Sequence, residues 1–160
     1  MNMDTFTHIH EGRVRMVDIS YKEISVRRAV ASGYIQLKPE TIEAIRHRQV
    51  EKGNVLATAR IAAVQAVKRT WDTIPMCHQI PITHVDVDFD VEDARVHAVV
   101  EVRSVGRTGV EMEALHGVSV ALLTVWDMVK SAEKDETGNY PETVISDIRV
   151  VEKVKEGKDK

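Results

Sequence analysis

The chain has 160 residues, a formal net charge of −3 at pH 7, 43% hydrophobic residues and 29% charged residues. This length and balance are typical of one soluble globular domain with its own core. The lack of a basic excess argues against a nucleic-acid partner. No uninterrupted apolar run reaches the roughly 18 residues that a membrane-spanning helix needs, so we expect no membrane partner.

The single cysteine, Cys77, excludes an internal disulfide framework and fits a reducing compartment. The first residues, MNMDTFTHIHEG, lack the basic start and apolar core of a signal peptide. We therefore expect a cytoplasmic protein. Residues 1–12 are predicted to be a flexible N-terminus, 13–153 a single domain, and 154–160 a charged, frayed tail.

The first half of the chain predicts a strand followed by two helices. Ala29–Leu37 is apolar enough for a strand, and Pro39–Arg48 favours a helix because proline is tolerated in a first turn. Asn54 is a good N-cap for a second helix over Val55–Trp71, where apolar residues recur at spacings near 3.6.

In the second half the apolar period changes to two. Thr83–Val91 and Arg95–Arg103 alternate apolar and polar residues and are separated by a short turn, which predicts a β-hairpin. Val105–Lys130 predicts one long helix with a capping box at Thr108, and Thr143–Val151 predicts a closing strand. Strands in hairpins with helices between them indicate an α+β fold, with helices packed on one face of an antiparallel sheet.

The long predicted helix carries charged groups at both ends. Glu113 lies in the first turn, where a carboxylate complements the helix dipole. Asp127 and Lys130 are three residues apart near the end, so they either form an ordinary surface pair or, if half-buried, serve as a general acid and base. Burial would raise the pKa of the aspartate and lower that of the lysine, and their pairing would oppose both shifts.

Two further segments carry groups suited to chemistry. Lys52 precedes Gly53 and the N-cap Asn54, a pattern that fits either a phosphate site at a helix N-terminus or a plain capped loop. Lys68 ends the second helix, and with Lys52 and several arginines it could form a basic pocket if the fold brings them together.

A stiff loop between Pro75 and Pro81 presents Met76, Cys77 and His78. His78 could act as an acid, a base or a hydrogen-bond donor. A structural zinc site would need more ligands at characteristic spacing, so we expect no metal ligands in the chain. A Cys77–His78 nucleophile pair is not expected either, because adjacent residues in an extended loop point apart.

Two long motifs carry a family resemblance. KGNVLATARIAAVQAVKRTWDTIPMCHQIP and GRTGVEMEALHGVSVALLTVWDMVKSAEKD, with MVDIS before them, resemble the molybdenum cofactor biosynthesis protein C family, the cyclic pyranopterin monophosphate synthases. The resemblance spans roughly residues 8–153. It implies a ferredoxin-like catalytic domain and a homohexamer built as a trimer of dimers. It implies a lyase that converts 3′,8-cyclo-7,8-dihydro-GTP to cyclic pyranopterin monophosphate and releases pyrophosphate.

The resemblance also implies roles for individual residues. Asp127, Lys130 and Lys52 match the family's catalytic residues. The positions that match its substrate-binding residues are Met76, Cys77, His78, Met112, Glu113 and Lys68. One departure is Gln79, where the family commonly has proline after the histidine, and it puts the loop geometry around His78 in doubt.

Helix geometry adds an expectation about assembly. Glu113 and Asp127 are separated by roughly 21 Å along a helix axis at about 1.5 Å per residue, which exceeds the reach of one nucleotide-sized pocket. We therefore expect a neighbouring subunit to complete each site, as a two-fold axis would allow.

No cofactor is required by the residues, although Mg²⁺ is compatible with a triphosphate substrate. Two alternatives stay open, a non-catalytic phosphate-sensing oligomer and a metal-dependent cyclohydrolase acting on GTP.

Overall fold

A four-stranded antiparallel sheet forms the centre of the protein, with the strand order β4-β5-β3-β6. The computed structural model describes residues 9–10 and 12–156. The strands are β3 (Ser25–Gln36), β4 (Ile82–Val91), β5 (Arg95–Gly106) and β6 (Val144–Glu156). A separate small pair joins β1 (Ile9–His10) to β2 (Arg13–Val14).

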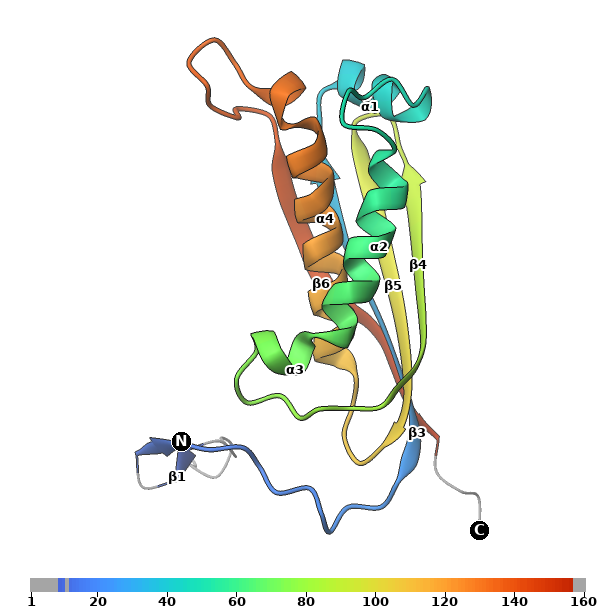
Figure 1. Ribbon diagram of the computed structural model, residues 1–160, viewed down its shortest axis with the longest axis vertical. Coiled ribbons are helices and arrows are strands. Elements are labelled where there is room, and N and C mark those ends of the chain that lie inside the picture. Colours follow the sequence, from blue (N-terminus) through green and yellow to red (C-terminus); the bar gives the residue numbers. More distant parts are fainter. Residues whose placement is uncertain (1–8, 11, 157–160) are drawn as a thin grey trace.

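Two long helices, α2 (Val55–Lys68) and α4 (Glu111–Glu133), cover one face of this sheet. The two shorter helices are α1 (Pro39–Arg46) and α3 (Thr70–Thr73). Figure 1 shows α2 and α4 side by side and running in opposite directions. With α2 between the first two sheet strands and α4 between the last two, the order is βαββαβ. The α+β, ferredoxin-like prediction is therefore confirmed.

The core lies between the sheet and the two long helices. On β5 the alternating residues Val96, Ala98, Val100 and Val102 are fully buried, as the period of two predicts. Gly117 lets α4 approach closely, since a Cβ there would lie 2.8 Å from Cγ2 of Val67 on α2 and 3.1 Å from Cγ1 of Val100 on β5.

The predicted start of the long helix is wrong. Val105 and Gly106 belong to β5 because they pair with Val26 and Ser25 of β3, so the strand is longer than its local pattern indicates. The helix begins at Glu111, and its N-cap residue is Val110, without a side-chain cap. The capping box expected at Thr108 is therefore not formed.

The second helix begins as predicted and ends early. Asn54 caps it, with Oδ1 accepting a hydrogen bond from the main-chain nitrogen of Ala57 at 3.1 Å. The helix ends at Lys68 rather than Trp71, and the short α3 follows. Buried Thr70 marks this break, because its hydroxyl donates to the main-chain oxygen of Ala66 at 3.1 Å.

The last strand runs past the predicted domain boundary at residue 153. β6 continues to Glu156, where Val154 pairs with Arg28 and Glu156 with Val26 of β3. Pairing with β3 orders these charged residues, which composition alone marks as a tail. Most of the N-terminal segment expected to be flexible (residues 1–8 and 11), and residues 157–160 of the expected tail, lie outside the described residues.

Among the described residues, α4 is long and apolar enough by length and composition to cross a membrane. Its apolar residues are interrupted by polar ones, so no uninterrupted apolar run marks it in the sequence. Half of its most apolar part is buried inside the fold, however, and core helices of soluble proteins are often as long and as apolar. The packing of α4 against α2 and the sheet accounts for its apolar composition.

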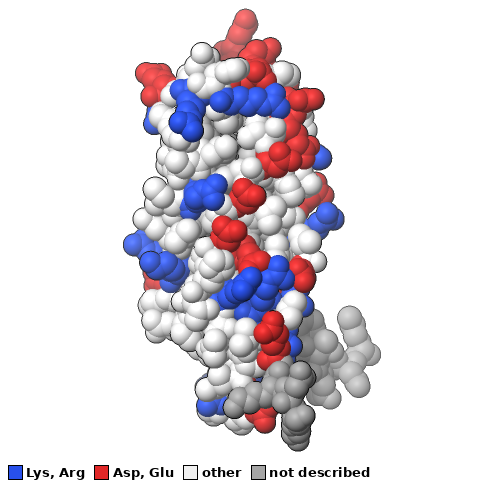
Figure 2. All heavy atoms as spheres, turned by 90° about the vertical axis from the view of Figure 1, so that its right-hand side faces the viewer, with Lys and Arg blue, Asp and Glu red and all other residues white. Residues whose placement is uncertain are grey.

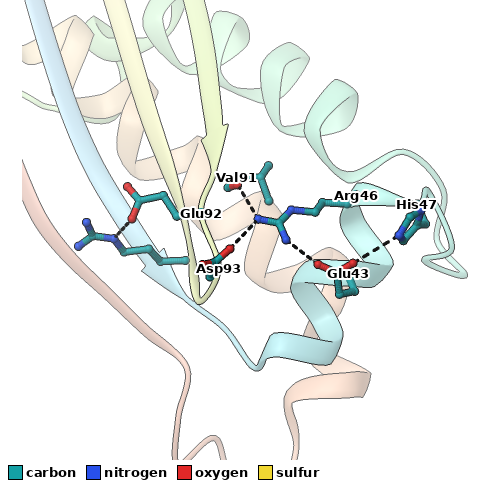
Figure 3. A network of polar contacts seen from close by, with 7 residues as sticks. Glu43, Arg46, His47, Val91, Glu92 and Asp93 are labelled. Carbon is teal, nitrogen blue, oxygen red and sulfur yellow. Dashed lines mark hydrogen bonds and ion pairs between the residues drawn. The ribbon is translucent and has the colours of Figure 1, made fainter.

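The connection from α1 to α2 is fixed at one end by Arg46. Its guanidinium donates to the main-chain oxygen of Val91 at 3.0 Å, and it pairs with Glu43 at 2.5 Å and with Asp93 at 3.3 Å (Figure 3). These contacts join α1 to the β4–β5 turn. They therefore fix the helix that precedes the segment carrying Lys52.

Candidate functional site

Lys52, Asp127 and Lys130 form one cluster at the C-terminal end of α4. The Nζ atom of Lys52 lies 2.7 Å from the main-chain oxygen of Asp127 and 3.1 Å from its Oδ2. The Nζ atom of Lys130 lies 2.8 Å from the other carboxylate oxygen, Oδ1. Asp127 is therefore held between two ammonium groups, as the proposed grouping of these residues requires.

The loop before α2 needs unusual backbone angles to present Lys52. Arg48 has a φ of 54° and Gly53 a φ of 105°, the second of which favours glycine strongly. Asn54 then caps α2. A cavity of about 490 Å³ lies beside Lys52 and is bordered across from it by Met128 and Ser131 of α4.

The cluster is more exposed than its apolar neighbourhood suggests. The side chains of Lys52, Asp127 and Lys130 are 43%, 58% and 44% exposed. Hydrogen bonds from Lys130 and then Lys52 lower the pKa of Asp127, and the bond to Asp127 raises the pKa of Lys130. Of the two opposing effects expected for this pair, pairing therefore outweighs burial at both Asp127 and Lys130 in the single chain.

A second group of predicted residues lines a cavity of about 310 Å³ at the opposite end of α4. Met76, Cys77, His78, Met112 and Glu113 all border it. The α3–β4 loop and the first turn of α4 therefore meet, as the resemblance implies. We call this space the lower cavity.

One wall of the lower cavity comes from a segment to which we assigned no site residues. The residues are Val17, Ile19, Tyr21 and Lys22. They have no periodic pattern, and the only signal in the sequence that points to them is the similarity of MVDIS to the family's N-terminal segment.

Glu113 is the most perturbed group in the lower cavity. The residue is only 3% exposed, and this burial raises its pKa to about 7, with the charge of Glu111 adding to the shift. Burial and then Glu113 raise the pKa of the Cys77 thiol. A raised pKa favours the neutral thiol form of Cys77 at pH 7.

Lys68 lies apart from both groups. It borders a third cavity of about 450 Å³, together with His84 of β4 and Ile80. Ile80 also borders the lower cavity, so the two spaces are neighbours.

The arginines do not join the lysines in one basic pocket. Arg28 pairs with Glu101 and Glu152, each at 2.7 Å, on the sheet face that the helices leave open. Arg60 donates to the main-chain oxygen of Val87 on β4. Figure 2 shows the resulting surface on the side of β4, where basic and acidic side chains are interspersed. The single basic pocket that we considered is not formed within one chain.

One chain does not bring the two main groups together. Lys52, Asp127 and Lys130 lie at one end of the α2–α4 pair, and the lower cavity lies at the other (Figure 1). Because α2 and α4 run in opposite directions, Lys52 in the segment before α2 contacts Asp127 near the end of α4. The segment after α2 meets the start of α4.

Within residues 9–10 and 12–156, no group of three or more His, Cys, Asp or Glu side chains is placed to hold a metal ion. The site residues therefore offer ammonium, carboxyl, thiol and imidazole groups for binding and proton transfer.

The fold and these groups define an α+β protein with a small-molecule site suited to a charged ligand. The chain belongs to the MoaC family, whose model matches residues 16–156. It is 68% identical over 154 residues to a probable cyclic pyranopterin monophosphate synthase of Methanococcoides burtonii, covering 96% of this chain and 97% of the relative. It is 69% identical over 151 residues to a protein of the same name from Methanosarcina mazei, covering 94% and 96%.

A third relative, from Methanothermobacter thermautotrophicus, is 61% identical over 155 residues, covering 97% of this chain and 98% of the relative. It is named a probable cyclic pyranopterin monophosphate synthase accessory protein. The similarity to all three relatives extends over nearly the whole chain.

Proposed function

We propose that this chain is a cyclic pyranopterin monophosphate synthase in molybdenum cofactor biosynthesis. It converts 3′,8-cyclo-7,8-dihydro-GTP to cyclic pyranopterin monophosphate and releases pyrophosphate. The observation that carries the proposal is the Lys52–Asp127–Lys130 cluster, in a chain 68% identical to a relative named for this activity.

The phosphate step needs positive charge. A sugar hydroxyl attacks the α-phosphorus, a new P–O bond forms, and the bond from the α-phosphorus to the bridging oxygen breaks as pyrophosphate leaves. Lys52 of one subunit, with Lys68 of another, stabilises the negative charge that builds up on the phosphate oxygens. Catalysis of such a step is mostly positioning and electrostatic stabilisation.

The ring rearrangement needs proton transfer. Asp127 is held ionised by its two lysines and accepts protons, while Lys130 is held protonated and donates them. The loop Met76–His78 and the pair Met112–Glu113 hold the guanine-derived ring in the lower cavity. At neutral pH Glu113, with a pKa of about 7, exchanges between acceptor and donor forms.

Both steps act on one substrate, which the two ends of α4 cannot reach within a single chain. The axial separation of Glu113 and Asp127 is roughly 21 Å at about 1.5 Å per residue. We propose that each complete site joins the lower cavity of one subunit to the lysine cluster of another across a two-fold axis. This arrangement is part of a homohexamer built as a trimer of dimers.

Mg²⁺ is proposed only as a counter-ion that arrives on the substrate triphosphate. Asp127 is already occupied by Lys52 and Lys130, and the described residues hold no metal-ligand cluster. A cytoplasmic location remains a prediction from the cysteine content.

Incubation of the purified chain with either GTP or 3′,8-cyclo-7,8-dihydro-GTP, with products detected by mass spectrometry, tests the proposal. We expect cyclic pyranopterin monophosphate and one equivalent of pyrophosphate from the cyclised substrate, and no turnover of GTP. Turnover of GTP would support a cyclohydrolase. Binding without turnover of either nucleotide would support a phosphate-sensing or accessory protein.

A further inference from the structure

Residues 16–24 cross one side of the lower cavity before the chain enters β3. We call this segment the strap. Val17, Ile19, Tyr21 and Lys22 of the strap border the cavity, together with the loop that carries His78 and the first turn of α4. The strap therefore forms a wall that the sheet and helices do not provide.

Two side chains from outside the strap bind its main chain. His78 Nε2 lies 2.7 Å from the main-chain oxygen of Val17, and the Arg107 guanidinium donates to the main-chain oxygen of Lys22. A carbonyl oxygen only accepts, so Nε2 of His78 carries the proton in this contact. The neutral Nε2–H tautomer and the imidazolium ion both keep the bond.

The rest of the strap is lightly held. Tyr21 and Ile24 are 76% and 60% exposed, so the strap buries little apolar surface. Its own turns are local, with the Ser20 nitrogen donating to Asp18 Oδ1 at 2.8 Å and the Lys22 nitrogen donating to the Ile19 oxygen at 3.1 Å. A segment with few buried contacts opens at a low free-energy cost, so a single hydrogen bond strongly affects how often it is closed.

We propose that His78, which itself borders the lower cavity, also has a positioning role: it holds the strap closed over the cavity and thereby places Tyr21 and Lys22 against the ligand. Among the described residues that line this cavity, Lys22 is the only lysine or arginine, so it supplies positive charge there. Tyr21 supplies an aromatic ring at the rim. The nature of the ligand, a nucleotide with a purine-derived ring and phosphates, depends on the proposed function.

Hydrogen–deuterium exchange of the ligand-free protein tests the tether without any need for turnover. His78→Phe keeps a ring of similar size but removes the donor, and we expect amides of residues 16–24 to exchange roughly tenfold faster than in the parent protein. His78→Gln keeps an N–H donor and should restore most of the protection. His47→Ala, at an exposed histidine whose ring pairs with Glu43 on α1, is the control and should leave the strap unchanged.

Steady-state kinetics then separates positioning from direct chemistry. If His78 acts through the strap, His78→Phe and Lys22→Ala both raise KM roughly tenfold and leave kcat within about twofold, and His78→Gln recovers KM. Unchanged strap exchange in His78→Phe overturns the proposal. Faster exchange accompanied by a large loss of kcat that His78→Gln does not recover also overturns it. If no variant and no parent protein turns over the substrate, the proposed function fails, while the exchange result still decides the tether.

Discussion

Lys52 and Asp127 are 75 residues apart in the chain, yet the Lys52 ammonium group contacts both the carboxylate and the main-chain oxygen of Asp127, at 3.1 and 2.7 Å. The contact exists because α2 and α4 pack in opposite directions, which brings the start of one beside the end of the other (Figure 1). With Lys130 on the other carboxylate oxygen, the cluster is a compact source of paired charges.

Replacing Asp127 or Lys130 by alanine is expected to abolish turnover and to leave the fold intact. We expect a loss of at least about 100-fold in kcat, because each group transfers protons in the proposed mechanism. The groups are exposed, and exposed ion pairs contribute little to stability. Circular dichroism and thermal unfolding should therefore match the parent protein while the product assay fails.

A matched control for these variants is Glu92→Ala. Glu92 also forms an exposed pair with a basic residue three positions away, Arg95, but lies outside the site. The Glu92→Ala substitution should change neither turnover nor thermal unfolding. Near-normal turnover in Asp127→Ala would rule out the assigned role.

Glu113 is expected to make the protein less stable as the pH rises. Its folded pKa of about 7 lies above the ordinary glutamate value of 4.5, so the folded state binds more protons between these two pH values. Stability therefore falls from about pH 4.5 to about pH 7 and then levels off. Glu113→Gln removes this pH dependence. The difference in unfolding free energy, Glu113→Gln minus parent, should therefore be about 2–3 kcal/mol larger at pH 8 than at pH 5. Urea unfolding of both proteins at the two pH values measures this difference. An equal change in the unfolding free energy of parent and variant would show that burial does not raise the pKa of Glu113.

Gly117→Ala is expected to destabilise the protein by about 1–2 kcal/mol, although alanine favours helices. The added Cβ would lie 2.8 Å from Val67 Cγ2 and 3.1 Å from Val100 Cγ1, and both valines are buried and stiff. Adding Val67→Ala opens space, so the double variant should lose less stability than the sum of the two single variants. Strictly additive losses in urea unfolding would show that α2 and α4 are not in close contact at Gly117.

Local patterns predicted those parts of the fold that depend on neighbours in the chain. The alternation around Val87 and Val100 predicted the β4–β5 hairpin, and Asn54 predicted the start of α2. The true end of β5 depends on Val105 pairing with Val26 of β3, which local periodicity cannot indicate. The helix cap expected at Thr108 was also wrong, because α4 begins at Glu111 with Val110 as its N-cap residue.

The site could be predicted from the sequence only in part. The spacing of Asp127 and Lys130 predicted their contact with each other. The contact of Lys52 with Asp127 depends on how α2 and α4 pack, which the sequence pattern does not show. The depth at which Glu113 is buried, and hence its raised pKa, follows from the loop and strap around it rather than from its own helix. The strap was missed because its binding to His78 is a single contact to a main-chain oxygen, which carries no side-chain signal.

Mixing inactive Glu113→Ala and Asp127→Ala subunits tests most directly whether each site joins the two ends of α4 from different chains. After subunit exchange has been confirmed by native mass spectrometry, each mixed two-fold pair would contain one intact site, with Asp127 from one subunit and Glu113 from the other. We predict that the mixture regains up to about one quarter of the parent turnover, the value for random pairing about a two-fold axis. Confirmed mixed oligomers that remain as inactive as either variant alone would contradict the shared site.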